Sequence, residues 1–174
     1  MPMKMLNANG ILDIAASRYG EQLYWHIRRI VVSREDAEDA MQETFLKIYT
    51  KASSFRGDEN AIAAWVYKIA TREALQVLRK RRAGLFQDID TVGEELSSVL
   101  VSECAPDADK SSILFQKATL TLSTKQRIAF MLRYYDDLSY AQIAEITGSS
   151  EGTLRTNYHL AVDKIKEYLT EHAI

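Results

Sequence analysis

The sequence predicts an all-α protein of two small helical domains joined by a flexible acidic linker, the second domain being a helix-turn-helix. The chain of 174 residues has only two prolines and seven glycines, and 47% of its residues are hydrophobic, as in packed globular proteins. Apolar residues recur at steps of three and four along nearly all of it, which is the period of amphipathic helices. An acidic stretch with weak periodicity interrupts this pattern, so we place the domains at residues 10–84 and 113–172 and the linker at 85–112.

Composition limits the classes of function. Cys104 is the single cysteine, so neither an internal disulfide nor a cysteine-based zinc site can form, and the three histidines are too scattered for a metal site. We therefore expect no metal and no cofactor. No apolar run reaches membrane-spanning length, and the N-terminus lacks the apolar core of a signal peptide. We expect a cytoplasmic protein without direct membrane insertion.

The net charge of −2 conceals separate charged blocks. The segment that ends in Arg79-Lys80-Arg81-Arg82 is basic, whereas residues 33–43 and 85–112 are acidic. Because the basic residues are concentrated in one segment, a near-neutral total does not exclude a nucleic-acid partner.

The first domain is predicted to contain three helices. The first covers residues 11–32 and is either continuous or broken near Gly20. The second runs from an N-cap at Ser33 to about Lys51, with Ala37, Met41, Phe45 and Ile48 on its core face. A loop at residues 53–58 separates it from a long third helix over residues 60–82.

The outer face of the second helix carries an acidic stripe with one apolar residue. The residues of this stripe that we assign to protein docking are Asp39, Gln42, Glu43 and Leu46. An exposed leucine among acids favours docking, although a solvated face is the commoner explanation of a charged stripe.

Basic and aromatic residues around the third helix are candidates for contacts with unpaired DNA. These candidates are Phe55, Arg56, Lys68, Arg72 and Arg79. Cations can follow the phosphates of a single strand, while a ring or a guanidinium plane can stack on a base. The alternatives are that Phe55 packs into the core and that Arg72 is a solvated charge.

The second domain contains the pattern of a helix-turn-helix at residues 138–169. Ser139 and Gln142 have capping-box spacing, and Gly148 lies in the turn before the second helix. That helix has one apolar face, and its opposite face carries Arg155, Thr156, His159, Leu160 and Asp163. A short helix, a glycine-containing turn and a longer helix with polar residues facing outward form the pattern of a DNA-binding helix-turn-helix. The alternative is an ordinary helical hairpin with a solvated face.

Both halves contain motifs that resemble those of the extracytoplasmic-function (ECF) sigma factors of bacteria. The first half is similar to region two of that family at DAEDAMQETFLK (36–47), FRG (55–57), AWVYKIA (64–70) and LRKRR (78–82). The second half is similar to region four at LS (122–123), QR (126–127), LRYY (132–135), LSY (138–140), IA (143–144) and GTLR (152–155). Two motif sets in this order are far more specific than any one of them.

The resemblance implies a dissociable initiation subunit that directs core RNA polymerase to promoters. Region two of the family docks on the polymerase clamp and captures the −10 element as a single strand, and region four reads the −35 element. The resemblance implies that the base- and phosphate-reading positions of region four are Arg155, Thr156, His159 and Leu160 in this sequence. The resemblance also implies a separate anti-sigma factor. The family often has arginine or lysine where this chain has Asn157, Leu160 and Asp163, which predicts a different or weaker −35 contact.

Three other functions compete with this one. A stand-alone helix-turn-helix regulator would need no polymerase-docking stripe and would usually dimerise. A helical module that mimics a sigma factor would bind proteins only. An enzyme acting on a small-molecule substrate is disfavoured, because the sequence shows no paired catalytic carboxylates, activated nucleophile or phosphate-binding glycine loop.

Overall fold

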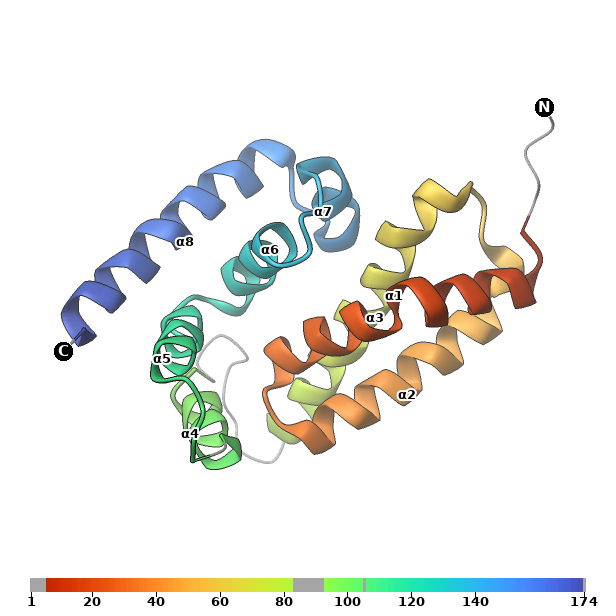
Figure 1. Cartoon of the computed structure of the whole chain (residues 1–174). Helices are drawn as coiled ribbons and strands as arrows, with labels where there is room; N and C mark the ends of the chain where they lie inside the picture. The colour runs from red at the N-terminus through yellow and green to blue at the C-terminus, as the bar shows by residue number, and fades with distance from the viewer. Residues whose placement is uncertain (1–5, 83–92, 105, 174) are drawn as a thin grey trace. The chain divides into compact units, whose positions relative to one another are not determined.

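The computed structural model describes residues 6–82, 93–104 and 106–173, and within them every regular element is a helix. The side chains of residues 81, 82 and 93–95 lie outside the description. The chain divides into two compact units, Met1–Val77 and Leu78–Ile174 (Figure 1). The all-α expectation is confirmed. None of the described helices is both long and apolar enough to cross a bilayer.

The first unit is built from three long helices and one short turn of 3-10 helix. Its elements are α1 (Ala8–Val31), α2 (Arg34–Lys51), η1 (Ala52–Ser54) and α3 (Glu59–Arg82), of which residues 78–82 are counted with the second unit. Helices α1 and α2 pack side by side, and α1 is continuous through Gly20 (Figure 1). The core face of α2 is formed by Ala37, Ala40, Thr44 and Ile48, all of which are fully buried. Met41 and Phe45, which we expected on the core face, are only half-buried. The buried face of α2 instead includes the smaller side chains of Ala40 and Thr44.

A tight turn at Val32 sets the direction in which α2 leaves α1. Val32 has φ 66° and ψ −47°, and the Ser33 amide donates to the Val31 carbonyl at 2.7 Å, which defines a γ-turn. This conformation is strained for a β-branched residue. Arg28 Nε donates to the Val32 carbonyl at 2.7 Å and helps to hold the turn, while the Ser33 hydroxyl caps α2 by accepting from the Asp36 amide.

Two polar pairs tie α3 to its neighbours inside the first unit. His26 of α1 is fully buried, with Nε2 2.8 Å from Thr71 Oγ1 of α3, and its ring meets that of Tyr67 edge-on. Lys47 of α2 pairs with Glu73 of α3, whose side chain is only 6% exposed. Because a buried polar group is costly without a partner, these pairs fix how α3 lies against α1 and α2.

The first unit should lose stability as the pH falls below about 6.5. Burial, helped by the charge of Arg29, lowers the pKa of His26 from 6.5 to about 3. Between these values the unfolded chain takes up a proton that the folded unit does not. The free energy of unfolding therefore decreases as the pH is lowered, and at pH 5 the loss is about 2 kcal/mol. Urea unfolding followed by tryptophan fluorescence isolates this unit, since Trp25 and Trp65 are the only tryptophans. His26→Gln is the control, and an equal pH slope in that variant would contradict the prediction.

The second unit contains a helix inside the stretch that we expected to be a flexible linker. Helix α4 (Gly93–Glu103) occupies part of residues 85–112, and α5 (Lys110–Thr119) begins within it. Leu96 and Leu100, four residues apart, are both buried, and α4 contacts α5. Part of this stretch is therefore helical, because two leucines at helical spacing give the acidic segment an apolar face. Residues 83–92 lie outside the described residues.

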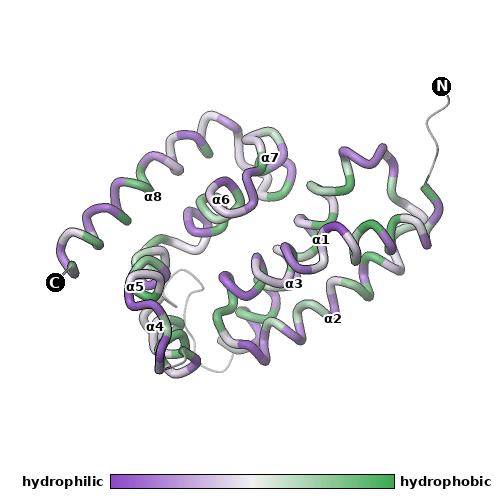
Figure 2. The backbone as a smooth tube through the Cα atoms, in the orientation of Figure 1, coloured by the Kyte–Doolittle hydropathy of each residue, from purple (hydrophilic) through white to green (hydrophobic). Residues whose placement is uncertain are grey.

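The remaining helices form the core of the second unit. They are α6 (Thr124–Tyr134), α7 (Tyr140–Thr147) and α8 (Glu151–His172), with α5 and α6 packed on α8. The core cluster is Ala118, Leu122, Phe130, Ala161 and Ile165, with partly buried aromatic residues around it. Apolar and polar residues alternate along α8 in Figure 2, as expected for a helix with one buried face.

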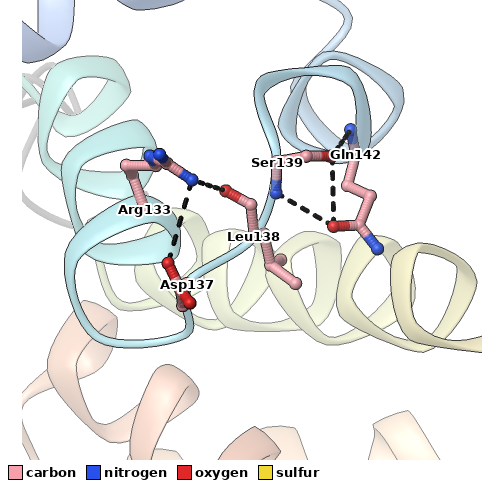
Figure 3. A network of polar contacts seen from close by, with 5 residues as sticks. All are labelled: Arg133, Asp137, Leu138, Ser139 and Gln142. Carbon is pink, nitrogen blue, oxygen red and sulfur yellow. Dashed lines mark hydrogen bonds and ion pairs between the residues drawn. The ribbon is translucent and has the colours of Figure 1, made fainter.

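The predicted helix-turn-helix is confirmed in its local details. Ser139 and Gln142 form a complete capping box at the start of α7 (Figure 3), with bonds of 2.9 and 3.1 Å. Gly148 ends α7 in the left-handed region at φ 76°, and the Ser150 hydroxyl caps α8 by accepting from the Thr153 amide. Caps and turn together fix the angle between the two helices.

Alanine at the two glycines of this motif should have opposite effects. Gly148→Ala should destabilise the second unit by about 1 kcal/mol, because alanine reaches a left-handed conformation only at a cost. Gly152 lies inside α8, so Gly152→Ala should stabilise the unit by roughly 0.5–1 kcal/mol. A new Cβ meets nothing within 4 Å at either position, so packing does not enter the comparison. Thermal unfolding by circular dichroism measures both, and shifts of the same sign would refute the argument.

Candidate functional site

One face of α8 carries the four residues that we expected to read duplex DNA. Arg155, Thr156, His159 and Leu160 are all exposed, and Leu160 retains 48% of its accessible surface. The opposite face is anchored in the core by Leu154, Ala161 and Ile165. The fold therefore brings these four side chains together on one accessible surface, with donors and an apolar group within two helical turns.

Tyr140, at the start of α7, lies against two arginines from different helices. The guanidinium carbon of Arg155 is 4.9 Å from the Tyr140 ring centroid, and that of Arg133 from α6 is 5.0 Å from it. Both distances fall in the range of cation–π contacts. Burial and the neighbouring Tyr140 raise the pKa of Tyr158, which lies on α8 beside this group.

The basic residues proposed on α3 are accessible to different degrees. Arg72 and Arg79 are exposed and Lys68 is half-buried. Trp65 lies three residues before Lys68 on the same side of the helix and is half-buried. Its spacing of three and seven residues from Lys68 and Arg72 was the signal that could have identified it as an aromatic member of this stripe.

The loop before α3 packs back on the helix. Phe55 is half-buried, and its ring centroid is 5.0 Å from that of Trp65. Gly57 has φ 148°, and a Cβ there would come within 2.8 Å of Ala61 Cβ and 3.2 Å of Phe55 Cζ. One guanidinium nitrogen of Arg56 donates to the carbonyls of Ser53 and Phe55, each at 3.0 Å. Phe55 thus has a structural role, and the two rings still expose part of their surface.

The acidic stripe on α2 is continuous and accessible. Asp39, Gln42 and Glu43 are exposed, and Leu46 retains 56% of its accessible surface. Tyr49, one turn further on, is 59% exposed and adds a second large apolar side chain that the sequence reading missed. Exposed apolar groups beside charges are typical of protein-binding surfaces.

Within the part of the chain that the structure describes, no group of three or more His, Cys, Asp or Glu side chains is arranged to hold a metal ion. The strongly shifted side chains there serve the cores: burial lowers the pKa of Arg127 to about 10, which leaves it charged at neutral pH. The candidate surfaces on α2, α3 and α8 offer charges, hydrogen-bond donors and apolar contacts, the kinds of group through which proteins bind other proteins and nucleic acids.

Comparisons with known proteins cover most of the chain. Residues 15–84 match the model of Sigma-70 region 2, and residues 112–165 match that of Sigma-70 region 4. The first match begins in α1 and continues beyond the last residue of α3, and the second runs from α5 into α8. The basic stripe on α3, the candidate residues 155–160 of α8 and the acidic stripe on α2 fall inside these segments.

Individual relatives extend over nearly the full length. The chain is 30% identical to the ECF RNA polymerase sigma-E factor of Haemophilus influenzae, over 88% of this chain and 85% of that protein. It is 28% identical to the ECF RNA polymerase sigma factor SigW of Bacillus subtilis, over 92% and 88%. The sigma factor RpoE of Bartonella quintana, solved in complex with the anti-sigma factor NepR, aligns with a TM-score of 0.67 and 26% identity over 86% of this chain and 91% of that chain.

Proposed function

This chain belongs to the ECF family of RNA polymerase sigma factors, and on that premise we propose how its surfaces divide the work of promoter recognition. As a sigma factor it is a regulatory initiation subunit that binds core RNA polymerase and promoter DNA. In our proposal the region 2-like unit engages the polymerase clamp and the −10 element. The region 4-like unit engages the −35 element as a duplex.

The observation that carries this proposal is the separation of three surfaces of different chemistry on three helices. The stripe on α2 is acidic with exposed apolar side chains, which suits a protein partner that carries basic residues. The stripe on α3 is basic with partly exposed aromatic rings, which suits unpaired DNA. The face of α8 offers arginine, threonine and histidine on a helix that follows a tight turn, which suits the major groove.

Two further assignments follow from the family. We place the protein in the cytoplasm, where the polymerase is. The solved relative was captured with an anti-sigma factor, which supports a separate inhibitor of this kind for the present chain. Because the inhibitor must prevent both polymerase and DNA binding, the surfaces on α2, α3 and α8 are its natural targets.

Run-off transcription tests the function directly. Core RNA polymerase of Bacillus subtilis, with and without the purified chain, would transcribe a library of promoter fragments, and the products would be sequenced. The proposal predicts transcripts with defined start sites that appear only when the chain is added. Sequence-specific duplex binding without polymerase binding would instead identify a stand-alone helix-turn-helix regulator.

A further inference from the structure

We infer that Tyr140 is a positioning residue that orients Arg155 for its contact with duplex DNA. The inference rests on the proposed role of α8 in reading the −35 element. It concerns a residue outside that helix and outside the set of DNA contacts proposed above.

The backbone of Tyr140 is fixed independently of α8. Tyr140 is the first residue of α7, directly after Ser139, whose hydroxyl and amide are both bonded to Gln142 in the capping box (Figure 3). Its half-exposed ring lies 4.9 Å from the guanidinium carbon of Arg155, and its centroid is 6.5 Å from that of Tyr158 on α8. The first helix of the motif therefore supplies a rigid surface against which a side chain of the second helix rests.

The second arginine at this ring is held by the turn between α6 and α7. Arg133 donates to the Leu138 carbonyl at 3.0 Å and lies 3.8 Å from the Asp137 carboxylate (Figure 3). Its guanidinium carbon is 5.0 Å from the Tyr140 centroid, so Arg133 supports the ring while its own donors face the turn. Asp137 has φ 50°, a left-handed conformation that aspartate tolerates and that brings the Leu138 carbonyl within reach of Arg133.

Arg155 is in the opposite situation. Among the residues that the structure describes, its side chain makes no hydrogen bond and no ion pair, and its guanidinium rests on the tyrosine ring. A contact with the ring does not consume the N–H donors of a guanidinium. Arg155 is therefore restrained in orientation while its fork of donors remains available for a base edge or a phosphate.

The physical consequence is preorganisation. A long, free arginine loses side-chain freedom when it binds, and that loss weakens the complex. A ring that already restricts Arg155 removes part of this cost. The benefit should be larger for specific binding than for non-specific binding, because a bidentate base contact requires one orientation whereas a phosphate contact tolerates several.

The test compares Tyr140→Leu with Tyr140→Phe in the full chain. Leucine keeps an apolar side chain at the start of α7 but removes the ring, whereas phenylalanine keeps the ring and loses only the hydroxyl. Each variant is assembled with Bacillus subtilis core polymerase. Its affinity is measured for a duplex enriched from a random library by the wild-type holoenzyme, and for a shuffled duplex of the same composition. Circular dichroism melting confirms that each variant is folded.

We expect Tyr140→Leu to weaken binding to the enriched duplex by about three- to ten-fold, the factor that ordering one long side chain represents. Binding to the shuffled duplex should change by less than about two-fold, and Tyr140→Phe should behave as wild type on both. In an Arg155→Ala background, Tyr140→Leu should add no further loss, because its effect acts through the arginine.

The outcomes separate this inference from the proposed function. If Arg155→Ala leaves the enriched duplex fully bound, the role assigned to α8 is wrong. If Arg155→Ala weakens binding but Tyr140→Leu does not, only the positioning role fails. An equal loss from Tyr140→Leu with and without Arg155 would also overturn it, since Tyr140 would then contact DNA itself.

Discussion

Replacing Asp39 and Glu43 with lysine is expected to weaken binding to core RNA polymerase by about 100-fold, or about 3 kcal/mol, while leaving the fold intact. Charges of the same sign placed against each other across an interface cost several kcal/mol. Both carboxylates are exposed one turn apart on α2, beside the exposed Leu46. Neither makes an ion pair or hydrogen bond among the described residues, so their replacement should not disturb the unit.

A matched control is available on α8. Glu167 and Glu171 are also exposed carboxylates four residues apart, so Glu167→Lys with Glu171→Lys makes the same change in net charge outside the α2 stripe. Affinity would be measured by titrating fluorescently labelled chain with core polymerase at two salt concentrations. The control should bind as wild type. Native affinity of the Asp39→Lys, Glu43→Lys variant, with a native circular dichroism spectrum, would exclude α2 as the docking surface.

Arg155→Ala should weaken binding of the upstream duplex by about 1–3 kcal/mol, the usual worth of a bidentate contact with a base. Arg72→Ala should leave that binding unchanged and impair strand opening instead. The reason is geometric: Arg155 is exposed on the helix that follows the turn, whereas Arg72 is exposed on α3 in line with Lys68 and Trp65. Each arginine can therefore serve only the DNA that its own helix meets.

Two probes separate these defects: affinity for a duplex carrying the upstream element, and a potassium permanganate footprint of the opened strand. Arg18→Ala is the control for the loss of an exposed arginine. Arg18 forms an ion pair of 3.5 Å with Glu59 at the surface, and such pairs contribute little to the stability of the fold. Phe55→Ala is a poorer probe, because Phe55 packs on Trp65 and its removal would also disturb the loop. The same defect from Arg155→Ala and Arg72→Ala in both assays would contradict the division of labour.

The sequence by itself determined the three long helices of the first unit, the helix-turn-helix of the second unit, the caps at Ser33 and Ser139 and the outward faces that carry the candidate contacts. These features depend on residues close together in the chain. A period of three to four residues defines an amphipathic helix, and Ser33, Ser139 and Gly148 mark helix ends through bonds and backbone angles within a few positions. The exposure of Arg155 and of Asp39 followed from the same spacing, because the opposite face of each helix had to be buried.

Only the tertiary structure decided which residues meet across the fold. His26 bonds to Thr71, and Lys47 pairs with Glu73, over separations in sequence that no local pattern encodes. Tyr140 meets Arg155 only because the turn at Gly148 brings α8 back over the start of α7. Likewise, the acidic composition of residues 85–112 suggested a linker, whereas burial of Leu96 makes part of it a helix of the second unit. Such contacts arise when whole helices pack, and side-chain direction is fixed only then.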